Sequence, residues 1–235
     1  MFQADDWYNQ RIADGGPVYM ETHLGPGHLI VEPWNGFSSL LMLIPAMYWI
    51  YRMQKDGLKN GFLWLVILLV IMGGLGSGLF HAFRVSAFFL YMDIIPTGLL
   101  TMALAIYFWI KVLKKWWVVF FIYTPLLTSR FLFWNRLPDF LAINLSYFLS
   151  GVSIGLPLII YLFKTGFKGW HLVTGGILSF AVALAFRQLD SYAISFLPMG
   201  THFLWHTFAA AGTFFILDYL FRIIKISNPP IPTPD

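Results

Sequence analysis

The chain of 235 residues carries too little charge to coat a water-facing surface: it is 58% hydrophobic and 11% charged, with a mean hydropathy of +0.70. A soluble domain is about a quarter charged. The absence of cysteine excludes disulfides and thiolate metal sites. The net charge of +4 fits basic loops beside a membrane better than nucleic-acid binding, so we expect a lipid bilayer and no nucleic acid as partner.

Apolar runs that are long enough to cross a bilayer follow one another along the chain. Because a backbone in lipid must satisfy its own hydrogen bonds, such runs are expected to be helices. We predict an all-α integral membrane protein with seven transmembrane helices in a domain of residues 35–223, between a polar N-terminal segment, 1–34, and a tail, 224–235. The predicted spans are 35–53, 61–83, 88–110, 116–134, 139–163, 169–187 and 198–223.

Lysine and arginine divide unequally between the two ends of these spans. Loops on the cytosolic side are normally the more basic, so the division predicts an N-terminus outside the cytosol and a cytosolic C-terminus. One end carries five basic residues, Arg11, Arg84, Arg130, Arg136 and Arg187. The other carries ten, Arg52, Lys55, Lys59, Lys111, Lys114, Lys115, Lys164, Lys168, Arg222 and Lys225.

Several polar residues fall inside these apolar spans, near their outer ends. They are Ser77 and His81 in the second span, Asp93 in the third, and His202 and His206 in the seventh. Ionisable side chains inside a membrane are costly and usually functional. The predicted active site therefore lies in the outer leaflet, on the extracytoplasmic or lumenal side.

The spacing of the three histidines is typical of a metal site. His202 and His206 are four residues apart, so both rings leave the same face of one helix. With His81 they form a set of three imidazoles, which suits zinc with one position left open. Taken singly, His81 could be an interfacial group, Asp93 could pair with Arg84, and a serine in a membrane helix usually bonds to its own turn.

The pattern Ser77-x-x-x-His81, then Asp93, then His202-x-x-x-His206 resembles the alkaline ceramidases. Their wider superfamily also includes the progestin and adipoQ receptors and the GPI-remodelling hydrolases. The resemblance runs from about residue 19 to residue 206, and VEPWNGFSSLLMLIP, residues 31–45, is similar to the opening of the first helix in that family.

The resemblance implies a zinc-dependent amidase that hydrolyses ceramide to a sphingoid base and a fatty acid. His81, His202 and His206 would hold zinc, Asp93 would move protons during attack by water, and Ser77 would stabilise the oxyanion. It also implies a calcium site near the N-terminus, for which Glu21 and Glu32 occupy matching positions. However, Val18 stands where the family has an aspartate and His23 where it has an amide; Asp5, Asp6 and Asp14 are the other acids available.

Two alternatives share the same histidines. One is a progestin/adipoQ-type receptor with a structural or weakly hydrolytic zinc, and the other is a hydrolase for GPI or lipid esters. Receptor relatives generally have a cytosolic N-terminus, so the charge count favours the ceramidase branch. A haem held by His202 and His206 is disfavoured because both ligands would crowd one face of the porphyrin.

Overall fold

The computed structural model describes residues 14–25, 28–134 and 136–227, which form helices and turns without a β-strand. In chain order the elements are η1 (Glu21–Leu24), α2 (Pro33–Ser39), η2 (Leu40–Met42), α3 (Leu43–Lys55), α4 (Gly61–Phe83), α5 (Ala87–Leu113), α6 (Val118–Trp134), α7 (Asp139–Lys164), α8 (Trp170–Leu189), η3 (Asp190–Ser195) and α9 (His202–Ser227).

Five helical segments of the described residues are candidate membrane spans, which supports the prediction of a multi-pass membrane protein. Gly61–Phe83, Ala87–Leu113, Leu141–Lys164, Trp170–Ser195 and His202–Ser227 are each long and apolar enough to cross a bilayer. They correspond to the second, third, fifth, sixth and seventh predicted spans. The first predicted span is divided into α2, η2 and α3, and the fourth is α6, which has 17 residues. The count of seven spans therefore stays a prediction.

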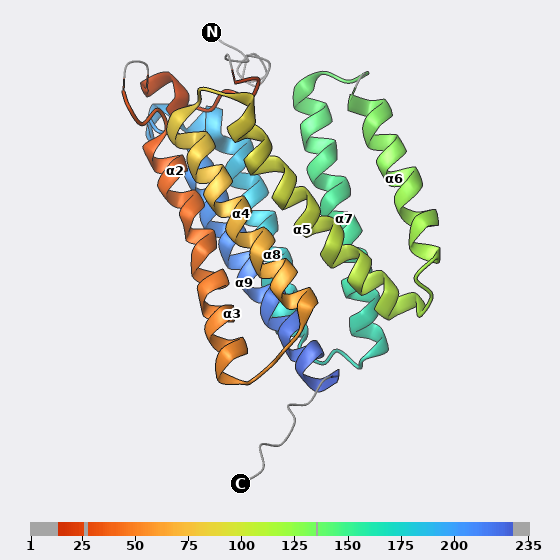
Figure 1. Ribbon diagram of the computed structural model, residues 1–235. Coiled ribbons are helices and arrows are strands. Elements are labelled where there is room, and N and C mark those ends of the chain that lie inside the picture. The colour runs from red at the N-terminus through yellow and green to blue at the C-terminus, as the bar shows by residue number, and fades with distance from the viewer. Residues whose placement is uncertain (1–13, 26–27, 135, 228–235) are drawn as a thin grey trace.

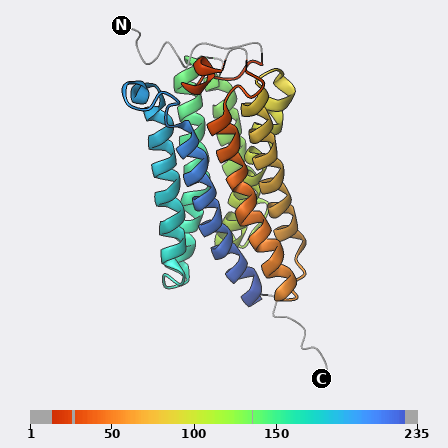
Figure 2. The ribbon, with the colours of Figure 1, turned by 90° about the vertical axis from the view of Figure 1, so that its left-hand side faces the viewer.

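The helices form an elongated bundle in which α9 has a central place. Figure 2 shows α9 between α8 on one side and the α2–α3 stack on the other. Helix α4 packs against α5, while α6 and α7 stand at one flank of the bundle (Figure 1). The described part of the N-terminal segment lies over one end of the bundle, and α9 finishes at the opposite end.

An apolar core fills the bundle between α3, α4, α5, α7, α8 and α9. Trp49, Phe108, Leu158, Leu220 and Phe221 are buried in it. Large apolar side chains also cover much of the outside of the helices, as expected for surfaces that face lipid. Most of the buried polar and charged side chains gather instead at the end beneath the N-terminal segment.

Two glycines allow α4 to approach its neighbours closely at that end. A Cβ added at Gly76 would lie 2.1 Å from the carbonyl oxygen of Met92 in α5. A Cβ at Gly78 would lie 2.9 Å from Leu40 Cδ2 in η2. Small residues permit such close contacts between membrane helices, with backbone at Gly76 and with a side chain at Gly78. The contact at Gly76 is what places Ser77 beside Asp93.

The turn between α4 and α5 is short and well defined. Arg84 ends α4 in the left-handed conformation, with φ of 51°, and its amide donates to the Phe80 carbonyl at 2.9 Å. Ser86 begins α5 by accepting the amide of Phe88 at 3.1 Å. The turn fixes His81 and Asp93 on adjacent helices at the same end of the bundle.

The start of the last helix differs from its prediction. The seventh span was predicted from residue 198, but Gly200 has φ of 72° and forms a turn, so α9 begins at His202. His202 thereby occupies the first turn of a helix and not its interior. The pair His202 and His206 still shares one helical face.

Candidate metal centre

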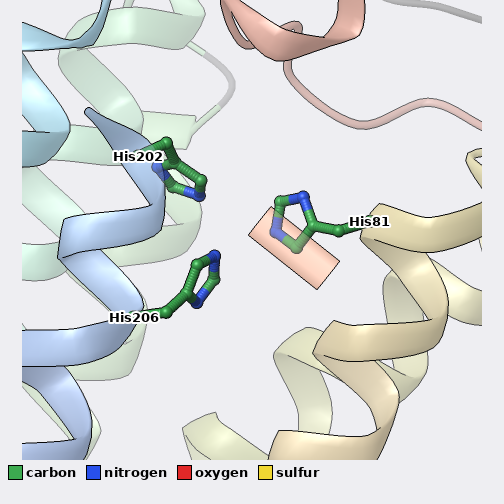
Figure 3. A group of neighbouring side chains, drawn as sticks. All are labelled: His81, His202 and His206. Atoms are coloured by element: carbon green, nitrogen blue, oxygen red, sulfur yellow. The ribbon is translucent and has the colours of Figure 1, made fainter. Parts of the chain in front are cut away.

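Three buried histidine side chains converge from two helices. His81 comes from α4, and His202 and His206 come from α9; their rings face a common point in Figure 3. The exposed fractions are 1%, 2% and 6%, and one ring nitrogen of each lies within 4.8 Å of the others. Zinc lies about 2.0–2.1 Å from each nitrogen ligand, so small rotations of the rings would close this set on one ion.

The ring nitrogens of these histidines are free or oriented in a way that suits metal coordination. His202 Nδ1 and His206 Nε2 are buried and have no hydrogen-bond partner among the described residues. An unpartnered buried nitrogen is costly, and coordination would remove that cost. His81 Nδ1 is 2.5 Å from Glu32 Oε2, which leaves its Nε2 available. A carboxylate on the second nitrogen of a ligating histidine is a common feature of zinc sites.

Glu32 connects His81 to a network of buried polar groups. Its carboxylate accepts hydrogen bonds from Thr22 Oγ1 at 2.5 Å and from Asn35 Nδ2 at 3.1 Å, and it forms an ion pair with Arg84. Burial alone would raise the pKa of the Glu32 carboxyl, but His81 and Arg84 outweigh this effect and hold that pKa at about 2. Glu32 is therefore a fixed anion that orients His81.

The first turn of α9 is held by Asp190 at the start of η3. Asp190 Oδ1 accepts the amides of Thr201 at 2.8 Å and His202 at 2.9 Å, and Oδ2 accepts the amide of Met20 at 3.0 Å. A carboxylate at a helix N-terminus satisfies amides that lack partners within the helix. Asp190 thus joins the N-terminal segment, η3 and α9 beside His202.

Tyr19 covers the centre from the N-terminal segment. Its ring stacks on His202 with centroids 3.8 Å apart and lies 5.3 Å from the His81 ring. Tyr19 is itself buried, with 7% of its surface exposed. Two of the three candidate ligands are therefore packed against a residue that precedes all the membrane helices.

Asp93 and Ser77 lie together next to the three histidines. The carboxylate of Asp93 is close enough to the Ser77 hydroxyl and to His81 for electrostatic interaction with both. The Ser77 hydroxyl oxygen also accepts a hydrogen bond from the Ser39 hydroxyl at 3.1 Å. The structure does not pair Asp93 with Arg84 in a salt bridge, because Arg84 pairs with Asp14 and Glu32. A carboxylate and a hydroxyl thus lie on the His81 side of the candidate metal centre.

The two residues predicted for calcium have other partners. Glu21 caps α2, since its carboxylate oxygens accept the amides of Trp34 at 2.7 Å and Asn35 at 2.9 Å. Glu32 is engaged by His81 and Arg84. Because the Arg84 guanidinium already pairs with Glu32 and Asp14, and Glu21 is engaged by backbone amides, this arrangement does not fit a calcium ion. Asp5 and Asp6 lie outside the described residues.

The remaining histidines do not join the centre. His23, His28 and His171 are exposed, and His171 lies in the first turn of α8, which starts at the opposite end of the bundle (Figure 1). Glu32 was not predicted as the partner of His81, and the roles of Tyr19 and Asp190 and the ion pairs of Arg84 were not predicted either. Spacing gave no signal for these residues because all of them lie in irregular segments or at helix ends.

A scan against protein-family models and a search of curated proteins find no match to this chain. The family resemblance therefore rests on the five residues Ser77, His81, Asp93, His202 and His206 and on the segment that opens the first helix. What the structure adds is that these five residues, far apart in sequence, lie at one place in the bundle.

Proposed function

We propose that this protein is an intramembrane zinc-dependent amidase of the alkaline ceramidase type, which hydrolyses ceramide or a related N-acyl lipid. The observation that carries the proposal is the set of three buried histidines with two unpartnered ring nitrogens, beside a carboxylate and a hydroxyl. A structural metal alone needs no such neighbours. An acyl-transfer site needs both, one to move protons and one to stabilise the oxyanion.

His81, His202 and His206 would hold the ion, and a bound zinc would polarise the substrate carbonyl and acidify a water molecule. Asp93 is the group placed to take a proton from the attacking water. It then returns that proton to the nitrogen of the departing amine as the C–N bond breaks. The products are a carboxylic acid and a free amine, so one water molecule is consumed for each amide cleaved.

Ser77 supplies the second polar function. Its hydroxyl lies one helical turn before His81 on the same face of α4, next to Asp93. From there it can donate a hydrogen bond to the oxygen that becomes negative during attack. The hydroxyl of Ser39 in α2 fixes the position of Ser77 from the other side.

The surroundings of the centre favour a lipid substrate. The site lies at the end of helices whose outward faces are apolar and exposed, such as Phe88, Tyr91 and Ile95 in α5. Asp93 lies on that same helix, so the chains of an N-acyl lipid could lie against α5 while the amide reaches the centre. We also propose that the chain crosses the membrane seven times, with α2–α3 as the first span and α6 as the fourth.

The orientation is part of the proposal: the centre would lie in the extracytoplasmic or lumenal leaflet. Cysteines introduced at Gln188 and at Gly166 test this, since the native chain has no cysteine. With the proposed topology, an impermeant thiol reagent added to the outside of the membrane labels the first position and spares the second. The reverse labelling pattern would place the centre in the cytosolic leaflet.

The activity is tested with purified protein, zinc analysis and lipid mass spectrometry. We expect about one zinc per chain and release of sphingoid base and fatty acid from ceramide. Faster cleavage of a matched lipid ester would favour the esterase alternative. Bound zinc without turnover of either lipid would favour a receptor with a structural ion.

A further inference from the structure

The oxygen atoms around Arg84 resemble the ligand set of a hard metal ion. The guanidinium contacts both carboxylate oxygens of Asp14, with Nε–Oδ2 at 2.6 Å and Nη2–Oδ1 at 3.3 Å. It also contacts the Pro17 carbonyl oxygen at 2.9 Å, Thr22 Oγ1 at 3.3 Å and Glu32 Oε1. These five oxygens all come from the segment before α2 and are called here the oxygen cage.

The cage is closed to solvent and supported by an aromatic ring. The side chains of Arg84, Asp14 and Glu32 are 1%, 0% and 0% exposed. The Arg84 guanidinium carbon lies 4.5 Å from the Phe80 ring centroid, which suits a cation over an aromatic face. The buried carboxylates of Asp14 and Glu32 need a cation beside them, because isolated buried charges are very costly.

We infer that Arg84 is a built-in substitute for a bound divalent cation, so that the metal centre is assembled without calcium. Calcium binds six to eight oxygens from carboxylates, carbonyls and water, and the cage offers carboxylate, carbonyl and hydroxyl oxygens. Here a side chain of the protein occupies the position that a calcium ion would take. The left-handed backbone at Arg84, with φ of 51°, directs the chain out of α4 at this residue.

Arg84 acts on the metal centre through one carboxylate. Glu32 receives Arg84 on Oε1 and His81 on Oε2, so the guanidinium holds the anion that orients the histidine. Arg84 is therefore a positioning residue and does not itself touch the reacting atoms. This role of Arg84 rests on the proposed function only in that His81 binds zinc.

The test measures melting temperature in detergent, in calcium-free buffer and with added calcium or magnesium chloride. Wild-type protein is expected to melt at the same temperature in all three. Arg84→Ala leaves two carboxylates facing each other and is expected to melt lower by roughly 6–20 °C. Calcium, but not magnesium, should then raise its melting temperature, because the cage without the guanidinium suits the larger ion.

Two further variants make the result specific. Arg84→Ala combined with Asp14→Asn removes a cage carboxylate and should lose the response to calcium. Arg52→Ala removes an arginine from the opposite end, where the side chain is 33% exposed. It should show a shift of no more than about 4 °C and no response to calcium.

Zinc content supplies a second readout. The zinc affinity of Arg84→Ala should be lower than that of the wild type by roughly 10–100-fold. Added calcium should restore this affinity. If Arg84→Ala is recovered folded only when calcium is present throughout purification, that result also supports the inference.

Stabilisation of the wild type by calcium would overturn the inference. So would an Arg84→Ala variant that melts like wild type, one that is destabilised without responding to calcium, or one that cannot be recovered even with calcium. None of these measurements uses a lipid substrate. Failure of the amidase proposal would therefore leave the result unchanged, and failure here would leave the amidase proposal standing.

Discussion

The two ends of the bundle each carry a group of paired charges, and the two groups differ in burial. At the site end, Arg84 pairs with Asp14 and Glu32, and all three side chains are 1% exposed or less. At the other end, Asp56 pairs with Lys225 at 2.9 Å and with Arg52 at 3.5 Å, and the basic side chains are 41% and 33% exposed.

The same kinds of residues therefore have different consequences at the two ends. Removing one partner of a buried pair leaves an uncompensated charge and costs about 3–5 kcal/mol. Exposed pairs contribute only about 0.2–1 kcal/mol because water and salt screen them. The site end depends on its charges for its geometry, whereas the other end depends on its apolar core. The predictions below test that contrast, from the largest expected effect to the smallest.

The largest effect is expected from replacing both histidines of α9. His202→Ala combined with His206→Ala leaves a single imidazole, so the protein should lose its zinc and all turnover of ceramide. Elemental analysis and lipid mass spectrometry on the same preparation measure the two losses. Single variants can retain weak zinc and serve as intermediates. Full zinc occupancy in the double variant would show that the ion binds elsewhere.

Asp93→Asn separates catalysis from metal binding. The amide keeps the size and polarity of the side chain but cannot accept the proton, so zinc should stay while turnover falls by roughly 10²–10⁴-fold. Ser77→Ala should also retain zinc and reduce turnover by roughly 10²–10³-fold through loss of an oxyanion donor. Native turnover by both variants would mean that neither residue takes part in the chemistry.

Glu32→Gln should weaken the metal centre without removing a ligand. The amide cannot serve as the anion for His81 and Arg84, so zinc affinity should fall by roughly 10–100-fold. Competition with a chromophoric zinc chelator measures the affinity. Glu21→Gln is the matched control, because Glu21 contacts the backbone of α2 but not His81. Equal losses of affinity in the two variants would contradict the orienting role of Glu32.

Lys225→Ala should have the smallest effect. It breaks the exposed pair with Asp56, so the free energy of unfolding should change by about 0.2–1 kcal/mol. Zinc content should remain that of the wild type. Thermal unfolding at low and high salt checks the result, since added salt should reduce the difference further. A loss as large as that of Arg84→Ala would remove the contrast between the two ends.

The contrast also explains which parts of the site could be predicted from sequence. His81, Asp93, His202 and His206 stand out because each is an ionisable residue in an otherwise apolar run, where such residues are costly. Asp14, Glu32 and Asp190 lie in polar or irregular segments, where acids are ordinary. Their partners depend on the path of the chain before α2, for which no periodic pattern exists. Spacing could therefore not assign Glu32 to His81.

The fold was predictable to a similar degree. Continuous apolar runs indicated α4, α5, α7, α8 and α9, and their bounds agree closely with the predicted spans. The division of residues 33–55 into α2, η2 and α3 was missed, because an apolar run shows the same hydropathy across a break as within one helix. The turn before His202 was missed as well, since it depends on the positive φ of a single glycine, Gly200.

The glycines of α4 limit how this protein can diverge during evolution. At Gly76 a single added methyl group would lie 2.1 Å from the carbonyl oxygen of Met92, and at Gly78 it would lie 2.9 Å from Leu40. A substitution at Gly76 would have to move the backbone of α5, whereas one at Gly78 would have to move only the end of the Leu40 side chain. By contrast, Met72 and Leu75 are 46% and 43% exposed toward the outside and can exchange for other apolar residues. In descendants of this sequence, glycine at position 76 should be retained longer than the apolar residues on the outer face of the helix.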